Sequence, residues 1–168
     1  VGAGDQWGSI YHLMNETQTT RTVYIQYTLR YQPGATATNS RPVQPWFMDV
    51  TGCGDSTYDV PGNGGPGSEH LASRSWQAPR EGMAMFAGGH LHDGGIDITL
   101  GDTAPNSLAC VMSAYYENPH HLASIDWCLL HEKVIAGHSY RVTARYDNSK
   151  PYADVMGIVL AYVWWGTQ

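Results

Sequence analysis

Residues 155–165 read VMGIVLAYVWW and are the clearest indication of the fold class. Its β-branched, aliphatic and aromatic residues are typical of a strand buried within a sheet. It is also far shorter than the roughly 20 apolar residues that cross a bilayer as a helix. Because neighbouring side chains of a strand point to opposite faces, Trp164 and Trp165 place one ring on each side of the sheet.

Segments of similar character recur outward from this stretch, with turns about every ten residues. Residues 22–31, TVYIQYTLRY, alternate β-branched or aromatic residues with polar ones, which predicts a half-buried strand. Further strands are expected at 46–50, 73–78, 82–92, 97–100, 107–116, 138–147 and 155–165. Residues 61–67, PGNGGPG, predict a surface loop, and only 129–137 leaves room for a helical turn. This rhythm predicts an all-β fold, an antiparallel β-sandwich of jelly-roll type.

The composition narrows the class of protein. The 168 residues are about one domain's worth, so we expect a single domain over residues 1–168. Apolar residues make up 42% and charged residues 14%, which argues against disorder and coiled coil. The net charge of −6 and the lack of a basic run exclude a nucleic-acid binder, and no segment is apolar enough for a membrane span.

Three cysteines leave at least one thiol unpaired within the chain. Cys110 and Cys128 flank a turn-like Glu117-Asn118-Pro119, so a hairpin can bring them together as a disulfide. Cys53 lies in a glycine-rich loop. A disulfide predicts a secreted or extracytoplasmic protein, whereas the alternative is three reduced thiols in a cytosolic one.

Of the eight histidines, His90 and His92 are the most informative, because Leu91 alone separates them at the end of an apolar stretch. Residues i and i+2 of a strand point to the same face, about 7 Å apart, so the two imidazoles can chelate one ion. Asp93 is a candidate to orient one ring. The alternative is a pair of exposed imidazoles at a strand end.

Met156 would identify the metal. A thioether is a poor ligand for zinc, calcium or magnesium but a good one for Cu(I), so a methionine that reaches the histidine pair indicates copper. The alternative is ordinary core packing at the start of an apolar strand.

Two motifs carry a resemblance. GGHLHDGG at 88–95, followed by YDNSKPYADVMGI at 146–158, resembles the second copper-binding domain of the copper type II ascorbate-dependent monooxygenases, the peptidylglycine α-hydroxylating and dopamine β-monooxygenases. Single-domain bacterial secreted proteins and plant stress-up-regulated nodulin-type proteins look more similar still. The likeness spans roughly residues 20–165, and it implies one copper ion held by His90, His92 and Met156.

The chain departs from these enzymes in length, because it is too short to include their other domain, in which three histidines hold an electron-supplying copper. His12 and His70 are candidates to complete the predicted site. His120 and His121 are expected at the surface, as are His131 and His138.

These observations predict a secreted mono-copper protein that reacts with oxygen or peroxide, in the manner of a monooxygenase or peroxygenase. It would need an external electron donor or a partner protein, and a small-molecule substrate. The alternatives are a copper storage or delivery protein without catalysis, and a carbohydrate-binding or adhesion module. No G-x-S-x-G, P-loop, C-x-x-C or H-E-x-x-H motif suggests another chemistry.

Overall fold

The computed structural model describes residues 40–102, 109–118 and 121–166, together with residues 4, 6, 11, 13, 15, 17–30 and 33–34. The chain divides into an N-terminal unit, Val1–Pro42, and a sandwich unit, Val43–Gln168. No helix is present among the described residues, and hence none that is long and apolar enough to cross a bilayer.

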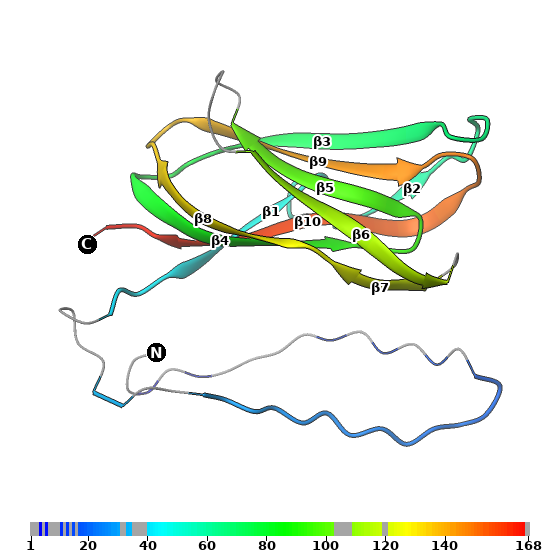
Figure 1. Ribbon diagram of the computed structural model, residues 1–168, viewed down its shortest axis with the longest axis horizontal. Coiled ribbons are helices and arrows are strands. Elements are labelled where there is room, and N and C mark those ends of the chain that lie inside the picture. The colour runs from blue at the N-terminus through cyan, green and yellow to red at the C-terminus, as the bar shows by residue number, and fades with distance from the viewer. Residues whose placement is uncertain are drawn as a thin grey trace. The chain divides into compact units, whose positions relative to one another are not determined.

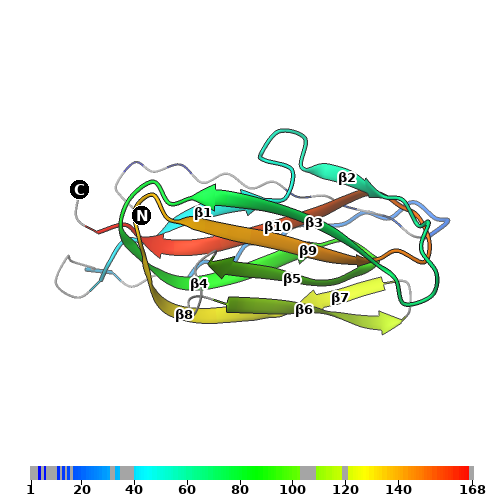
Figure 2. The same ribbon diagram turned by 90° about the horizontal axis from the view of Figure 1, so that it is seen from above.

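The sandwich unit consists of two antiparallel sheets that pack face to face, which confirms the predicted β-sandwich (Figures 1 and 2). One sheet has the strand order β1-β10-β4-β8, with β2 also paired to β10, and the other has the order β3-β9-β5-β6-β7. The strands are β1 (Gln44–Asp49), β2 (Thr57–Val60), β3 (Glu69–Gln77), β4 (Gly82–Leu91), β5 (Gly95–Asp102), β6 (Ala109–Asn118), β7 (His121–Ile125), β8 (Trp127–Val134), β9 (Ser139–Asp147) and β10 (Tyr152–Trp164).

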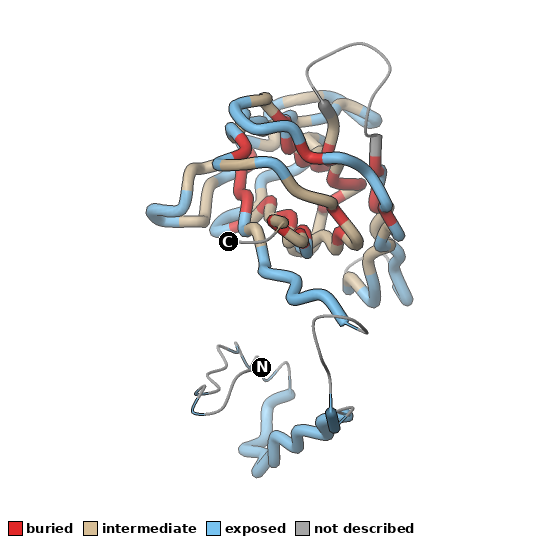
Figure 3. The backbone as a smooth tube through the Cα atoms, turned by 90° about the vertical axis from the view of Figure 1, so that its left-hand side faces the viewer, coloured by how far each residue is buried: buried red, intermediate tan, exposed pale blue. Residues whose placement is uncertain are grey.

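The core lies between the sheets and follows the two-residue period of the strands. Along β10, Val155, Gly157 and Val159 are buried, whereas the residues between them are partly exposed. β9 alternates in the same way. Figure 3 shows the buried residues gathered inside the sandwich unit. Because alternate side chains point inward and outward, β10 has one face in the core and one on the outer surface of the sheet.

The predicted disulfide between Cys110 and Cys128 is confirmed, and Cys53 is a free, exposed thiol. As expected, a hairpin lies between them, formed by β6 and β7 and closed at Asn118 and His121. β6, which carries Cys110, pairs with β7, whereas β8, which carries Cys128, pairs with β4 in the opposite sheet. The disulfide therefore joins the two sheets.

Two expectations are wrong. Residues 22–30 form no strand, and their apolar side chains are exposed, Tyr24 at 90%. No strand among the described residues pairs with them, and an extended segment without a neighbour has no ladder to stabilise it. Most of the expected helical turn at 129–137 lies in strand β8, where Leu130 and Val134 are buried and the residues between them are exposed.

Asp49 ends β1 and fixes the loop that follows. Its buried carboxylate accepts hydrogen bonds from the main-chain N–H groups of Thr51, Gly52 and Cys53 and from the hydroxyl of Ser56. Burial alone would raise the pKa of this carboxyl, but the hydrogen bonds outweigh burial and lower the pKa. Asp49 is therefore an ionised anchor for the loop between β1 and β2.

Candidate metal centre

The histidine pair lies where β4 ends. Leu91 is buried in the core, so His90 and His92, one position to either side, share the opposite, outer face of the sheet. His90 is exposed and His92 is half-buried. Their ring centroids are 5.2 Å apart with the planes at 89°. The predicted juxtaposition of two imidazoles on one face is therefore present.

The electrostatic surroundings favour a neutral His90. Its pKa is lowered because packing around the ring desolvates the charged form, and because His92 lies beside it. The neutral imidazole is the form that ligates a metal ion, since only it has a free nitrogen lone pair.

Met156 lies on β10, the strand next to β4. The two strands pair Ile158 with His90 and Gly157 with Leu91. Met156 lies two residues before Ile158, so it points to the same face of β10 as Ile158 does. Paired residues of an antiparallel ladder share a face. Met156 is half-buried between the buried Val155 and Gly157, as expected for an outward-pointing residue.

Tyr146 fixes the main chain at this point, a role that no local sequence pattern indicates. It comes from β9 in the other sheet and is fully buried. Its hydroxyl accepts a hydrogen bond from the main-chain N–H of His92 at 2.8 Å and donates one to the main-chain carbonyl of Met156 at 2.5 Å. Burial raises the pKa of Tyr146 well above its usual value, so the hydroxyl keeps its proton. One oxygen atom thus ties His92 to Met156.

The turn after the pair is held by other contacts. Asp93, expected to orient a histidine ring, instead accepts a hydrogen bond from the main-chain N–H of Leu122 at 2.7 Å, which ties the turn to β7. Gly94 has a φ of +89°, and a Cβ atom there would lie 2.3 Å from the ring of Tyr152. This position therefore requires glycine both for its backbone conformation and for the close ring.

The other described histidines come from parts of the chain outside β4. His70 is opposite Tyr146 in the β3–β9 ladder and its ring lies 6.1 Å from that of Tyr58, so it faces the layer between the sheets rather than the outer face. His131 is exposed on β8, as predicted, and His138 is half-buried with its ring 5.5 Å from that of Tyr140.

His121 is exposed at the start of β7, whereas His12 and His120 lie outside the described residues.

Among the described residues, no three histidine, cysteine, aspartate or glutamate side chains gather into a metal-binding cluster. The candidate donors are therefore two imidazoles and one thioether. No family model, no curated protein and no solved structure matches the chain.

Proposed function

We propose that this protein binds one copper ion through His90, His92 and Met156 and that the bound ion reacts with oxygen or peroxide. The observation that supports the proposal is the pair of hydrogen bonds from Tyr146, because they hold the main chains of His92 and Met156 to the same oxygen atom. The pairing of Ile158 with His90 supports it further, because Met156 lies two residues from Ile158 on the same strand and so points to the same face.

The chemistry of the donors fits copper better than other common ions. Imidazole nitrogen suits copper and zinc, a thioether suits Cu(I), and hard cations such as magnesium and calcium prefer oxygen ligands. Copper bound here would supply one-electron redox chemistry. The protein residues would hold it, with Tyr146 and the β4–β10 ladder fixing the two strands that carry the donors.

The exposure of the site bears on what it can do. His90 lies at the solvent-accessible surface of the sheet, so three protein ligands would leave a coordination position open to a small molecule. A monooxygenase reaction also consumes two electrons, and we propose that an external donor or a partner protein supplies them. The disulfide fits a secreted or extracytoplasmic protein, and we retain a jelly-roll topology as part of the proposal.

The exposure of His90 also favours a second candidate, a protein that stores or delivers copper. A ligand at the surface is accessible to a partner that takes the ion. Such a protein would bind copper and transfer it without turnover.

Oxygen uptake by the copper-loaded full chain, with ascorbate as electron donor, distinguishes the two candidates. We expect uptake above that of the same concentration of free copper, lost in His92→Ala and kept in His131→Ala, a surface histidine of the same sheet. Tight copper binding with transfer to a Cu(I) chelator but no excess uptake would support storage instead. Failure of the wild type to bind copper would overturn both candidates.

A further inference from the structure

The outer face of the β1-β10-β4-β8 sheet is apolar next to the histidine pair. The ladders align Phe47, Leu160, Gly88 and Trp127 in one row across the four strands. Since paired residues share a face, this row points away from the core. The next row contains Tyr162, Phe86 and Leu129. Phe47, Trp127 and Leu129 are exposed.

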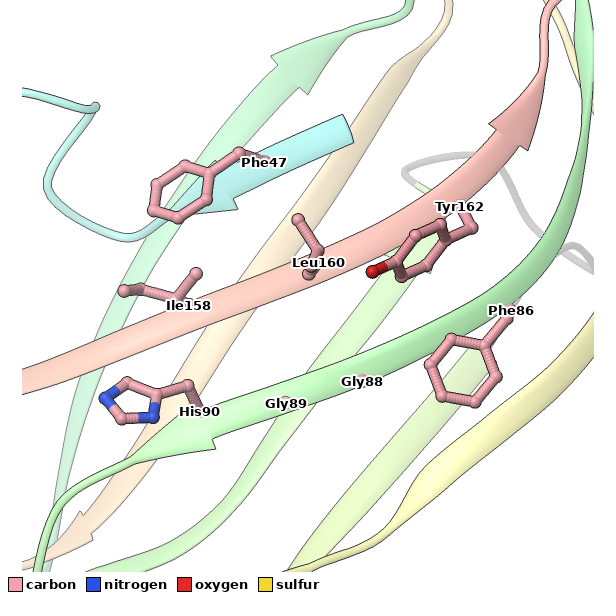
Figure 4. Close-up of a pocket in the computed structure, with 8 residues that line it drawn as sticks. All are labelled: Phe47, Phe86, Gly88, Gly89, His90, Ile158, Leu160 and Tyr162. Carbon is pink, nitrogen blue, oxygen red and sulfur yellow. The ribbon is translucent and has the colours of Figure 1, made fainter. Parts of the chain in front are cut away.

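The missing side chain of Gly88 hollows this face. A groove of about 390 Å³ lies over Gly88, with Phe47, Leu160, Phe86 and Tyr162 around it and with His90 and Ile158 at one end (Figure 4). A Cβ atom at Gly88 would come no closer than 3.4 Å to the ring of Phe86, which is ordinary van der Waals contact. The space is therefore open to a larger group.

The lining indicates what kind of molecule fits. It contains no charged side chain, and its polar side-chain groups are the hydroxyl of Tyr162 and the imidazole of His90. An ion that left water for this groove would lose hydration without gaining a counter-charge. The rings of Phe47, Phe86 and Tyr162 line the groove. Phe86 is supported by Trp127, whose ring stacks on it at 5.5 Å, and its ring meets that of Tyr162 at 5.9 Å.

We propose that this groove binds an uncharged aromatic small molecule with one end beside His90. This proposal rests on the proposed function only where it takes the bound molecule to be the substrate of a copper ion at His90. The occupant is a small molecule because a groove of about 390 Å³ accommodates a ligand of one or two rings. A second copy of the chain on this face is the competing outcome.

Titration of the metal-free full chain with N-phenyl-1-naphthylamine, an uncharged fluorescent probe, tests the groove without copper. We expect saturable binding, weakened about tenfold or more in Gly88→Leu, which fills the hollow. Gly65→Leu, which adds the same side chain in open space in the loop between β2 and β3, is the control and is expected to bind as the wild type does.

Any one of three results would overturn the proposal that the groove binds an uncharged aromatic molecule. Gly88→Leu would bind the probe as tightly as the wild type does. A sulfonated analogue, 8-anilino-1-naphthalenesulfonate, would bind as tightly as the neutral probe. Alternatively, the wild type would fail to bind the probe and light scattering would show a dimer that Gly88→Leu dissociates, which would assign the face to a second copy.

Addition of Cu²⁺ to the probe complex tests the link to the metal site separately. We expect copper to quench the fluorescence of the bound probe in the wild type but not in His92→Ala. If the wild type binds the probe but copper does not quench its fluorescence, the groove remains a ligand site and its assignment as a substrate site is overturned. Copper binding without probe binding would overturn the groove and leave the proposed function standing.

Discussion

The hydroxyl of Tyr146 accepts a hydrogen bond from the main-chain N–H of His92 across the layer between the two sheets. The same hydroxyl donates to the carbonyl of Met156. A buried residue of one sheet thus supports the two strands that carry the candidate ligands in the other. The candidate site depends on the packing of the sandwich as well as on the strands that carry its donors.

Tyr146→Phe tests this support. Without the hydroxyl, the main-chain groups of His92 and Met156 lose a partner, and we expect a loss of about 1–3 kcal/mol in the free energy of unfolding. We also expect weaker Cu(I) binding, measured by competition with a chelator. The control is Tyr140→Phe, since Tyr140 is equally buried and its hydroxyl accepts from Ile135, away from the site. An equal copper affinity in the two variants would contradict a positioning role for Tyr146.

Gly94→Ala is expected to be unusually costly. Its positive φ disfavours any other residue by about 1–2 kcal/mol, and its Cβ atom would also overlap the ring of Tyr152. Gly137 has a φ of +70° but open space around it, so Gly137→Ala carries the backbone cost alone. Urea unfolding of the two variants separates the contributions. A loss in Gly94→Ala no larger than in Gly137→Ala would show that the ring of Tyr152 yields freely.

Because of Asp49, we expect the free energy of unfolding to fall in acid. Its pKa is lowered by folding, so its contribution is complete above the unfolded pKa of about 4 and declines as the pH falls through the folded value. Asp49→Asn is expected to lose about 1–3 kcal/mol at pH 7 and to flatten the decline of stability below about pH 4. Ser56→Ala, which removes one of the donors, should give a smaller effect of the same sign. An unchanged acid profile in Asp49→Asn, measured by urea unfolding at several pH values, would contradict this role.

Removal of the disulfide is expected to lower the free energy of unfolding. Cys110 and Cys128 are 18 residues apart, and a cross-link that closes a loop of this length stabilises by about 3 kcal/mol. The double variant Cys110→Ala, Cys128→Ala should therefore unfold at a lower urea concentration than the wild type. Cys53→Ala, which removes the free and exposed thiol, should unfold with the wild type. A double variant as stable as the wild type would show that the sheets hold together without the covalent link.

The sequence predicted those elements whose period and composition reflect burial. Residues 155–165 and 82–92 have an apolar core face, and both correspond to central strands of one sheet. The alternation of residues 22–31 is also typical of a strand. A strand is stable only when a neighbouring strand pairs with it, and the sequence of one segment does not specify that neighbour. β8 is a strand that its sequence pattern does not reveal, because the apolar residues Leu129 and Trp127 are exposed and obscure the alternation of buried and exposed positions.

The candidate site divides in the same way. Strand periodicity puts His90 and His92 on one face from sequence alone. The position of Met156 beside them depends on the register of β10 against β4, and the role of Tyr146 depends on the packing of β9 from the opposite sheet. The apolar groove depends on a row that crosses four strands from distant parts of the chain. These are long-range relationships that no local pattern contains.

X-ray absorption at the copper edge of the Cu(I)-loaded full chain reports the donor atoms around the bound ion. We expect one ion per chain with nitrogen scatterers from imidazole and one sulfur scatterer, and the sulfur should disappear in Met156→Leu while the nitrogen signal stays. His131→Ala should leave the spectrum unchanged. A wild-type spectrum without sulfur, or one that Met156→Leu leaves unaltered, would contradict the two-histidine, one-methionine site.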